Sequence, residues 1–286
     1  MICARTASTV ASSASTFVSA RTAIGQRAYR RVTAEAAARC RRSETVFVFG
    51  SGYSLNDLAP AEWRHFEAHD VFGFSGFVHQ RWIRTDFHLV RGWDEDPTGL
   101  ARRRASSAAY ARMIRENPHF RQTLFILHGD FGSMTTHTIV GDRLLPAGAR
   151  ICWYRTAPRL DDRPSDAWAK GITHGPGTLA DVVNAAYLLG WTRIVLVGVD
   201  MYDSRYFWGP PDATLGFDEH GEFMAVRPTT EHAVRWNERH HASRNGLIEI
   251  LGAWTSSFAA AGVSLTVYNP RSLLRDAMPV YEATRS

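Results

Sequence analysis

The chain is poor in cysteine, in lysine and in long apolar runs, and each shortage narrows the class of protein. Only three cysteines occur in 286 residues, without the spacing of a metal-ligand set or a disulfide framework. A reducing, cytoplasmic setting is therefore expected. No apolar run reaches the roughly 18 residues of a membrane-spanning helix. Lys170 is the only lysine, and we attribute this to genome composition.

Acidic residues are absent from the first 34 positions, where Ser, Thr, Ala and Arg dominate. Residues 1–44 contain eight arginines and two glutamates, so they account for the formal net charge of +5 and leave the rest nearly neutral. We therefore expect no nucleic-acid partner. The segment also lacks the apolar stretch of a secretory signal. A basic, flexible arm is expected over 1–44, and peripheral contact with an anionic membrane surface or a transit peptide stay open.

Several catalytic signatures are missing as well. No G-K-[ST] is present, which excludes a phosphate-binding loop of the Walker type. No G-x-S-x-G elbow supports acyl transfer, and no H-E-x-x-H pair indicates zinc. The Gly50-Ser51-Gly52 turn lacks the third glycine of the dinucleotide fingerprint, because Leu55 stands there. NAD binding is therefore not favoured.

What the chain does contain, from residue 45 onward, is an alternation of short apolar strands and amphipathic helices. Residues 129–148 are predicted to form a loop or an irregular hairpin, and residues 201–240 an inserted lid. The pattern predicts one α/β domain over 45–286, built on a doubly wound, mostly parallel, Rossmann-like sheet. The predicted strands are 45–49, 70–74, 86–90, 123–127, 149–154, 193–197 and 263–270, and the predicted helices are 59–69, 98–116, 178–189 and 241–261.

Polar side chains follow the buried strand of the stretch LVGVDMYDSRYFW, residues 196–208. Ligands of doubly wound sheets bind beyond the carboxyl ends of the strands, so Asp200, Tyr202 and Tyr206 are candidates for a site there. Two phenols can bind phosphate oxygens without a metal ion. The alternatives are a turn cap for Asp200, packing for the tyrosines and a plain tight turn for the glycines.

Histidines also cluster, at His240 and His241, at the start of the predicted helix 241–261. Imidazole titrates near neutral pH, so one of them facing the site would be a suitable general base. An exposed surface histidine is the alternative.

Three segments together resemble a known family. FVFGSGYSLNDL, GTLADVVNAAYLLGWTRIVLVGVDMY and VYNPRSLL are similar to segments of the bacterial sialyltransferases of glycosyltransferase family 42. They are also similar to the related motility-associated-factor proteins, whose superfamily includes a hydroxymethylpterin diphosphokinase. The resemblance runs in order over about 45–275, and it implies a variant of the GT-A glycosyltransferase fold.

The resemblance also implies roles for individual residues. Tyr202 and Tyr206 would hold the phosphate of the donor, and His241 would be the base on the acceptor hydroxyl. The donor site would be lined by Gly50, Ser51, Gly52, Ser75, Arg91, Gly177, Thr178, Asp200, Asn269 and Ser272. Ser51, Ser75 and Arg91 stand where the family has asparagine. Arg91 would still suit an acidic activated sugar, because guanidinium binds carboxylate and phosphate groups in a bidentate manner.

The expected function is an inverting, metal-independent glycosyltransferase in the cytoplasm, and a location at the inner face of the membrane stays open. It would move a sialic-acid-like sugar from a CMP-activated donor to a glycan hydroxyl, without a cofactor, and homo-oligomerisation stays open. One alternative is an Mg²⁺-dependent diphosphokinase, with Asp200 and Asp203 as metal ligands. Another is a non-catalytic nucleotide-binding protein.

Overall fold

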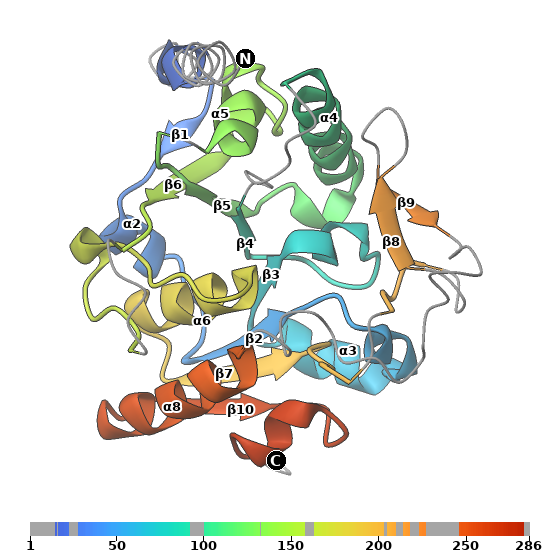
Figure 1. Ribbon diagram of the computed structural model, residues 1–286, viewed down its shortest axis with the longest axis vertical. Coiled ribbons are helices and arrows are strands. Elements are labelled where there is room, and N and C mark those ends of the chain that lie inside the picture. The colour runs from blue at the N-terminus through green and yellow to red at the C-terminus, as the bar shows by residue number, and fades with distance from the viewer. Residues whose placement is uncertain are drawn as a thin grey trace, which may run out of the picture.

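An eight-stranded sheet in which every neighbouring pair of strands is parallel forms the centre of the fold (Figure 1). The computed structural model describes residues 15, 17–22, 28–91, 100–131, 133–157, 163–202, 205–209, 214–217, 223–226 and 246–282. The strand order is β1-β6-β5-β4-β3-β2-β7-β10. The strands are β1 Arg30–Arg31, β2 Thr45–Phe49, β3 Asp70–Phe74, β4 Phe87–Val90, β5 Leu124–His128, β6 Arg150–Tyr154, β7 Arg193–Val197 and β10 Ser264–Val267.

Helices cover both faces of the sheet, because its strands are apolar on both sides. Val46 and Val48 of β2 belong to one core with residues of α2, α6 and α8. Phe47 and Phe49 point to the other face, where they pack with α3, and α4 and α5 cover that face over β5 and β6. The predicted doubly wound, Rossmann-like α/β fold is confirmed. The helices are α2 Ala34–Ala38, α3 Pro60–Glu67, α4 Leu100–Glu116, α5 Met134–Gly141, α6 Thr178–Leu188 and α8 Leu247–Ala260.

The folded part of the chain begins before residue 45, although the sequence analysis assigned 1–44 to the arm. β1 pairs with β6 in parallel, and Ala37 of α2 is fully buried in the core. The Tyr29 hydroxyl accepts a hydrogen bond from the Leu145 amide at 3.0 Å. Residues 28–44 therefore close one edge of the sheet, and residues 1–14 lie outside the described part.

A helix, α5, occupies the segment predicted as a loop or hairpin, so that prediction was wrong. Threonine and β-branched residues give Met134–Gly141 a weak intrinsic helix propensity. The residues from Thr135 to Val140 are all buried, and tertiary packing of this kind supplies most of the stability of a short helix.

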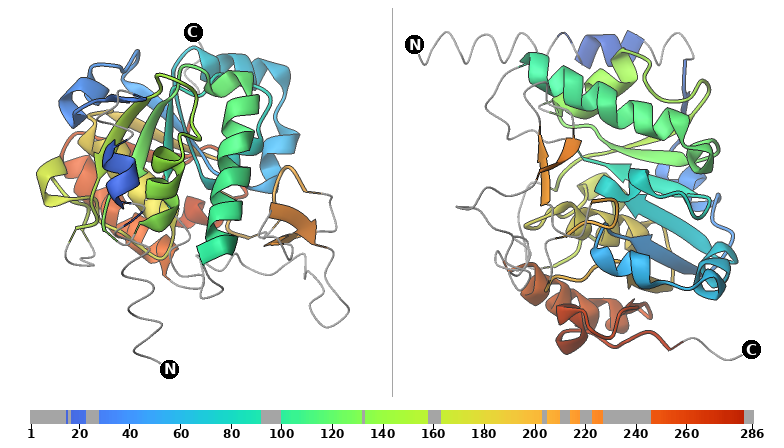
Figure 2. Two further views of the ribbon diagram at one scale, coloured as in Figure 1. Left: turned by 90° about the horizontal axis from the view of Figure 1, so that it is seen from above. Right: turned by 90° about the vertical axis from the view of Figure 1, so that its right-hand side faces the viewer.

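Within the predicted lid, the described residues include a two-stranded antiparallel hairpin of β8 (Thr214–Phe217) and β9 (Phe223–Val226). Figure 2 shows this hairpin beside α4 and outside the main sheet. The predicted helix 241–261 is present as α8, and its positions 241–245 lie outside the described residues.

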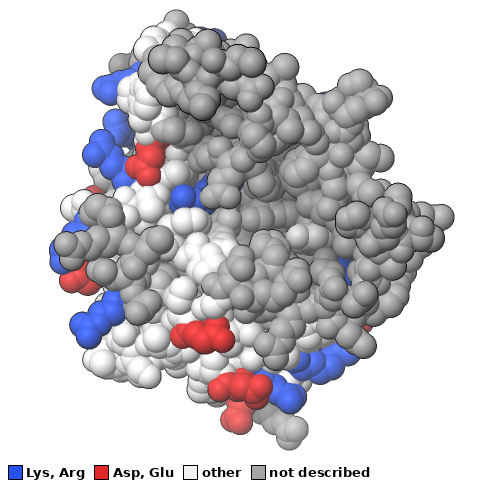
Figure 3. Space-filling model, in the orientation of Figure 1, with Lys and Arg blue, Asp and Glu red and all other residues white. Residues whose placement is uncertain are grey.

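The described surface mixes charges of both signs. On the coloured part of the face in Figure 3, basic and acidic side chains stand close to one another. Among the helices that the structure describes, none is both long and apolar enough to cross a membrane.

Candidate functional site

The strand order makes the carboxyl ends of β2 and β7 a topological switch point, and we call the region beyond these ends the crevice. From β2 the chain builds the sheet in one direction through β3, β4, β5 and β6, and then returns to the other side of β2 with β7. Adjacent loops diverge at such a switch point, which is where open α/β sheets bind ligands. The Gly50-Ser51-Gly52 turn follows β2 and Asp200 follows β7, so both lie at this point.

The two glycines of the turn are required by contact with the loop that follows β7. The amides of Gly50 and Gly52 donate to the carbonyls of Val197 and Gly198, each at 2.8 Å. A Cβ atom on Gly50 would lie 2.6 Å from the Gly198 carbonyl oxygen, and one on Gly52 would lie 2.5 Å from an Asp200 carboxylate oxygen. These two amides are therefore used inside the protein, while the Ser51 side chain is half-buried at the turn.

Asp200 joins the ends of three strands. Its buried carboxylate accepts hydrogen bonds from the Ser54 hydroxyl at 2.5 Å, the Ser54 amide at 3.0 Å and the Asn269 side-chain amide at 2.9 Å. Ser54 belongs to the short 3-10 helix after β2, and Asn269 follows β10. Asp200 therefore caps the turn that follows β2, and not the turn that follows its own strand, β7. The sequence analysis did not identify Ser54, whose position two residues after Gly52 was the available signal.

Ser272 supports the same junction from inside the protein. Its fully buried hydroxyl donates to the Val199 carbonyl at 2.6 Å and accepts from the Leu274 amide at 3.2 Å. The Ser272 hydroxyl thus fixes the segment after β10 against the segment after β7.

Both candidate tyrosines lie beside the glycine turn and are half-buried. The Tyr202 hydroxyl is 3.5 Å from the side-chain nitrogen of Asn269. Tyr206 forms an antiparallel bridge with Gly52, and its ring packs on Trp208 with centroids 4.7 Å apart. Burial raises the pKa of Tyr206, so its phenol is neutral and able to donate a hydrogen bond at neutral pH.

Two residues at this edge adopt the left-handed backbone conformation that favours glycine. Ser75, directly after β3, has a φ of 47°, and Met201, directly after Asp200, has a φ of 63°. Such conformations cost on the order of 1–3 kcal/mol each and concentrate at functional sites. The Tyr110 hydroxyl donates to the Ser75 carbonyl at 3.1 Å and holds that turn.

A second polar cluster lies along the same edge, at the ends of β4 and β6. The Asp181 carboxylate, in the first turn of α6, is fully buried. It accepts from Arg91 Nη1 at 2.8 Å, from the Tyr154 hydroxyl at 2.9 Å and from His174 Nδ1 at 2.6 Å. Arg91 is therefore ion-paired with a carboxylate of the protein. Gly177 and Thr178 begin the same helix.

His174 is the exposed member of this cluster, with 27% of its side chain accessible. Because Nδ1 donates to Asp181, the other ring nitrogen, Nε2, is left as an acceptor. Sequence reasoning missed this pair. An aspartate on the buried side of the apolar helix 178–189 was the available signal, since a buried carboxylate requires partners.

A Ser–His–Asp succession extends the cluster away from the crevice. His128 contacts the Ser133 hydroxyl through Nδ1 at 2.5 Å and Asp130 through Nε2 at 2.8 Å. Thr156 connects it to Arg91. Ser133 is fully buried, so the arrangement is structural and gives no exposed nucleophile.

The structure brings part of the predicted site together. Five candidates meet at the crevice, namely Gly50, Gly52, Asp200, Tyr202 and Asn269. The other described candidates lie beside them, at neighbouring strand ends or in the segments that support the crevice from inside the protein. His241 and Asp203 lie outside the described residues. Within the described ranges, no group of three or more His, Cys, Asp or Glu side chains is arranged to hold a metal ion.

Comparison with known proteins adds no relative. No protein-family model matches the chain, and no curated protein matches its sequence. A functional assignment therefore depends on the geometry of the crevice and on the resemblance of three segments of the chain to glycosyltransferase family 42.

Proposed function

We propose that the protein is a sialyltransferase-like glycosyltransferase that uses a CMP-activated nonulosonic sugar and a glycan hydroxyl. The supporting observation is that the resembling segments, distant in sequence, meet through Asp200. That carboxylate bonds to Ser54 after β2 and to Asn269 after β10. Parts of all three resembling segments therefore meet at one point of the carboxyl edge of the sheet.

In the proposed reaction the acceptor oxygen bonds to the anomeric carbon of the donor sugar. The bond from that carbon to the phosphate oxygen breaks, and CMP leaves with the electron pair. Tyr202 and Tyr206 donate hydrogen bonds to the departing phosphate, which is the role of neutral donors at a site of developing charge. The acceptor proton passes to an imidazole.

Two imidazoles are candidates for that base. The resemblance implies His241. Among the described residues, His174 is suitably arranged for this role, because its Nδ1 donates to Asp181 at 2.6 Å and its side chain is partly accessible. A Cβ atom built on Gly175, the next residue, would lie 3.8 Å from the Leu247 side chain at the start of α8. His241 is six positions before Leu247 in the sequence.

Ligand binding is the first test. A thermal-shift screen with CMP, CDP, UDP, ATP and NAD is expected to show stabilisation by CMP, since a ligand of the native state raises its stability. Stabilisation by NAD or ATP alone, or by none of the five, would refute the donor assignment.

Turnover is the second test. The double change Tyr202→Phe and Tyr206→Phe is expected to lower kcat by about 100-fold. Tyr187→Phe is the matched control, because that ring packs on Phe258 in the core. His241→Ala and His174→Ala are measured separately, and the base should lose about 100-fold or more. If both retain full kcat, neither is the base. Complete loss of activity in EDTA would instead favour the diphosphokinase alternative.

A further inference from the structure

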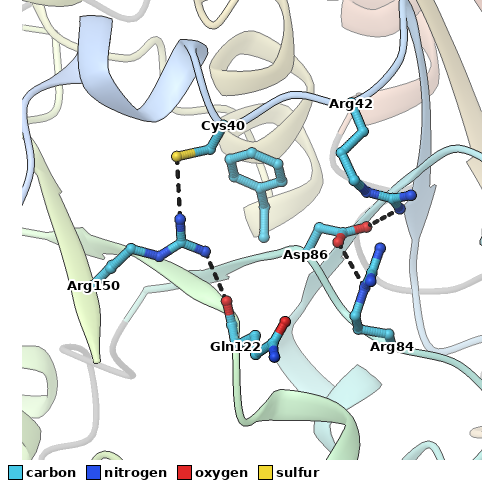
Figure 4. A pocket seen from close by; sticks show the side chains of 7 residues that line it. Cys40, Arg42, Arg84, Asp86, Gln122 and Arg150 are labelled. Carbon is cyan, nitrogen blue, oxygen red and sulfur yellow. Dashed lines mark hydrogen bonds and ion pairs between the residues drawn. The ribbon is translucent and has the colours of Figure 1, made fainter. Parts of the chain in front are cut away.

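A pocket lies at the amino edge of the sheet, opposite the crevice. Asp86 directly precedes β4, Gln122 precedes β5 and Arg150 begins β6. Its volume is about 140 Å³, against roughly 10–15 Å³ on the same measure for one water molecule. Figure 4 shows its labelled lining, which consists of Cys40, Arg42, Arg84, Asp86, Gln122 and Arg150.

The pocket carries more positive than negative charge. Arg42 and Arg84 share the Asp86 carboxylate, at 2.8 Å and 3.0 Å. Arg150, across the pocket in Figure 4, contacts only neutral acceptors among the described residues. Its Nη1 donates to Cys40 Sγ at 3.2 Å and its Nη2 donates to the Gln122 carbonyl at 2.8 Å. In the part of the chain that the structure describes, Arg150 has no carboxylate partner, and because it is half-buried its guanidinium group is only partly hydrated.

Hydrogen-bond donors remain available around the same space. In the described part of the chain, the two terminal nitrogens of Arg84 and the side-chain amide of Gln122 have no hydrogen-bond acceptor. The Arg84 side chain is 45% exposed, so it can turn toward a ligand. A guanidinium group presents a planar pair of donors that matches the oxygens of a phosphate group.

We infer that this pocket, bounded by Arg84 and Arg150, binds a phosphate group. A tetrahedral oxyanion there provides the counter-charge that Arg150 lacks and accepts from Arg84 and Gln122. The volume holds the phosphate group with a few water molecules. The site is separate from the crevice and does not depend on the proposed transferase activity.

Titration calorimetry with sodium phosphate tests the inference in the full-length protein, at constant ionic strength set with sodium chloride. Saturable binding is expected in the wild type. Arg150→Gln and Arg84→Gln are each expected to weaken it at least tenfold. The matched control is Arg64→Gln, which removes an exposed arginine of α3 that has no ion pair among the described residues, and it should leave the affinity unchanged.

Several outcomes would overturn the inference. One is the absence of saturable binding to the wild type. Another is a wild-type affinity for phosphate in both Arg150→Gln and Arg84→Gln. The third is a loss of affinity in Arg64→Gln as large as the loss in the pocket variants. Loss of phosphate binding in the Tyr202→Phe and Tyr206→Phe protein would place the anion in the crevice instead. Should Arg150→Gln fail to fold, Arg84→Gln, a substitution at the exposed rim, decides the result alone.

Discussion

Acid is expected to destabilise the protein through one histidine in the middle of the sheet. His88 is fully buried in β4. Its Nε2 lies 2.7 Å from the Tyr110 hydroxyl, which donates its own proton to the Ser75 carbonyl. When Nε2 carries the proton of the neutral ring, it donates a hydrogen bond to the Tyr110 hydroxyl oxygen. The other ring nitrogen, Nδ1, has no hydrogen-bond partner. A second proton on this ring would have no acceptor.

Burial lowers the pKa of His88 from 6.5 to about 3. A histidine with a lowered pKa binds protons more readily in the unfolded chain, so stability falls as the pH drops below 6.5 and continues to fall toward 3. Each pH unit in this window corresponds to about 1.4 kcal/mol. Between pH 6.5 and 5, His88 alone should therefore lower the free energy of unfolding by roughly 2 kcal/mol.

Urea denaturation of the wild type and of His88→Gln, at several pH values from 7.5 to 5, measures this contribution. Glutamine does not titrate and retains an amide that can reach Tyr110. The pH slope of stability should be shallower in the variant by up to about 1.4 kcal/mol per pH unit. Other titrating groups are common to both proteins and cancel in the difference. Parallel pH profiles would refute the reasoning.

Three further predictions concern the edge of the sheet that carries the crevice. Asp200→Ala should lower the free energy of unfolding by roughly 3–5 kcal/mol, and Asp200→Asn by less, in urea denaturation; equal effects would argue against the junction. Gly52→Ala should cost about 1–3 kcal/mol and weaken CMP binding in calorimetry, and a neutral result would show that the turn has room for a Cβ atom. Asp181→Asn should cost about 3–5 kcal/mol, because it leaves the Arg91 charge unpaired. Replacing Arg91 by leucine in the Asp181→Asn protein removes the unpaired charge and should recover part of that loss, and a double variant as unstable as Asp181→Asn would contradict the ion-pair argument.

The parallel core was predictable because its strands are short and apolar and stand between turn residues. β2, β3 and β7 have the predicted bounds, Thr45–Phe49, Asp70–Phe74 and Arg193–Val197. α5 and β1 were not predictable in the same way. Buried neighbours stabilise α5 in spite of its composition, and β1 consists of two arginines whose strand conformation depends on pairing with β6.

The candidate site was also predictable only in part. The residues that directly follow strands, such as Asp200, could be assigned to the carboxyl edge from the order of elements alone. Their partners could not. Arg91 and Asp181 are 90 positions apart, and only the packing of α6 against the sheet brings them together. Ser54 and His174 were missed for the same reason, since a hydrogen bond between distant segments leaves no periodic pattern.

The closed edge of the sheet has a consequence for biosynthesis. Tyr29 leaves the ribosome 116 residues ahead of Leu145, its hydrogen-bond partner. At about 5–20 residues per second, the segment at 28–44 waits on the order of 6 to 20 seconds before β6 is available to it. During that interval this segment must stay soluble without a docking surface, and its five arginines suit it to do so.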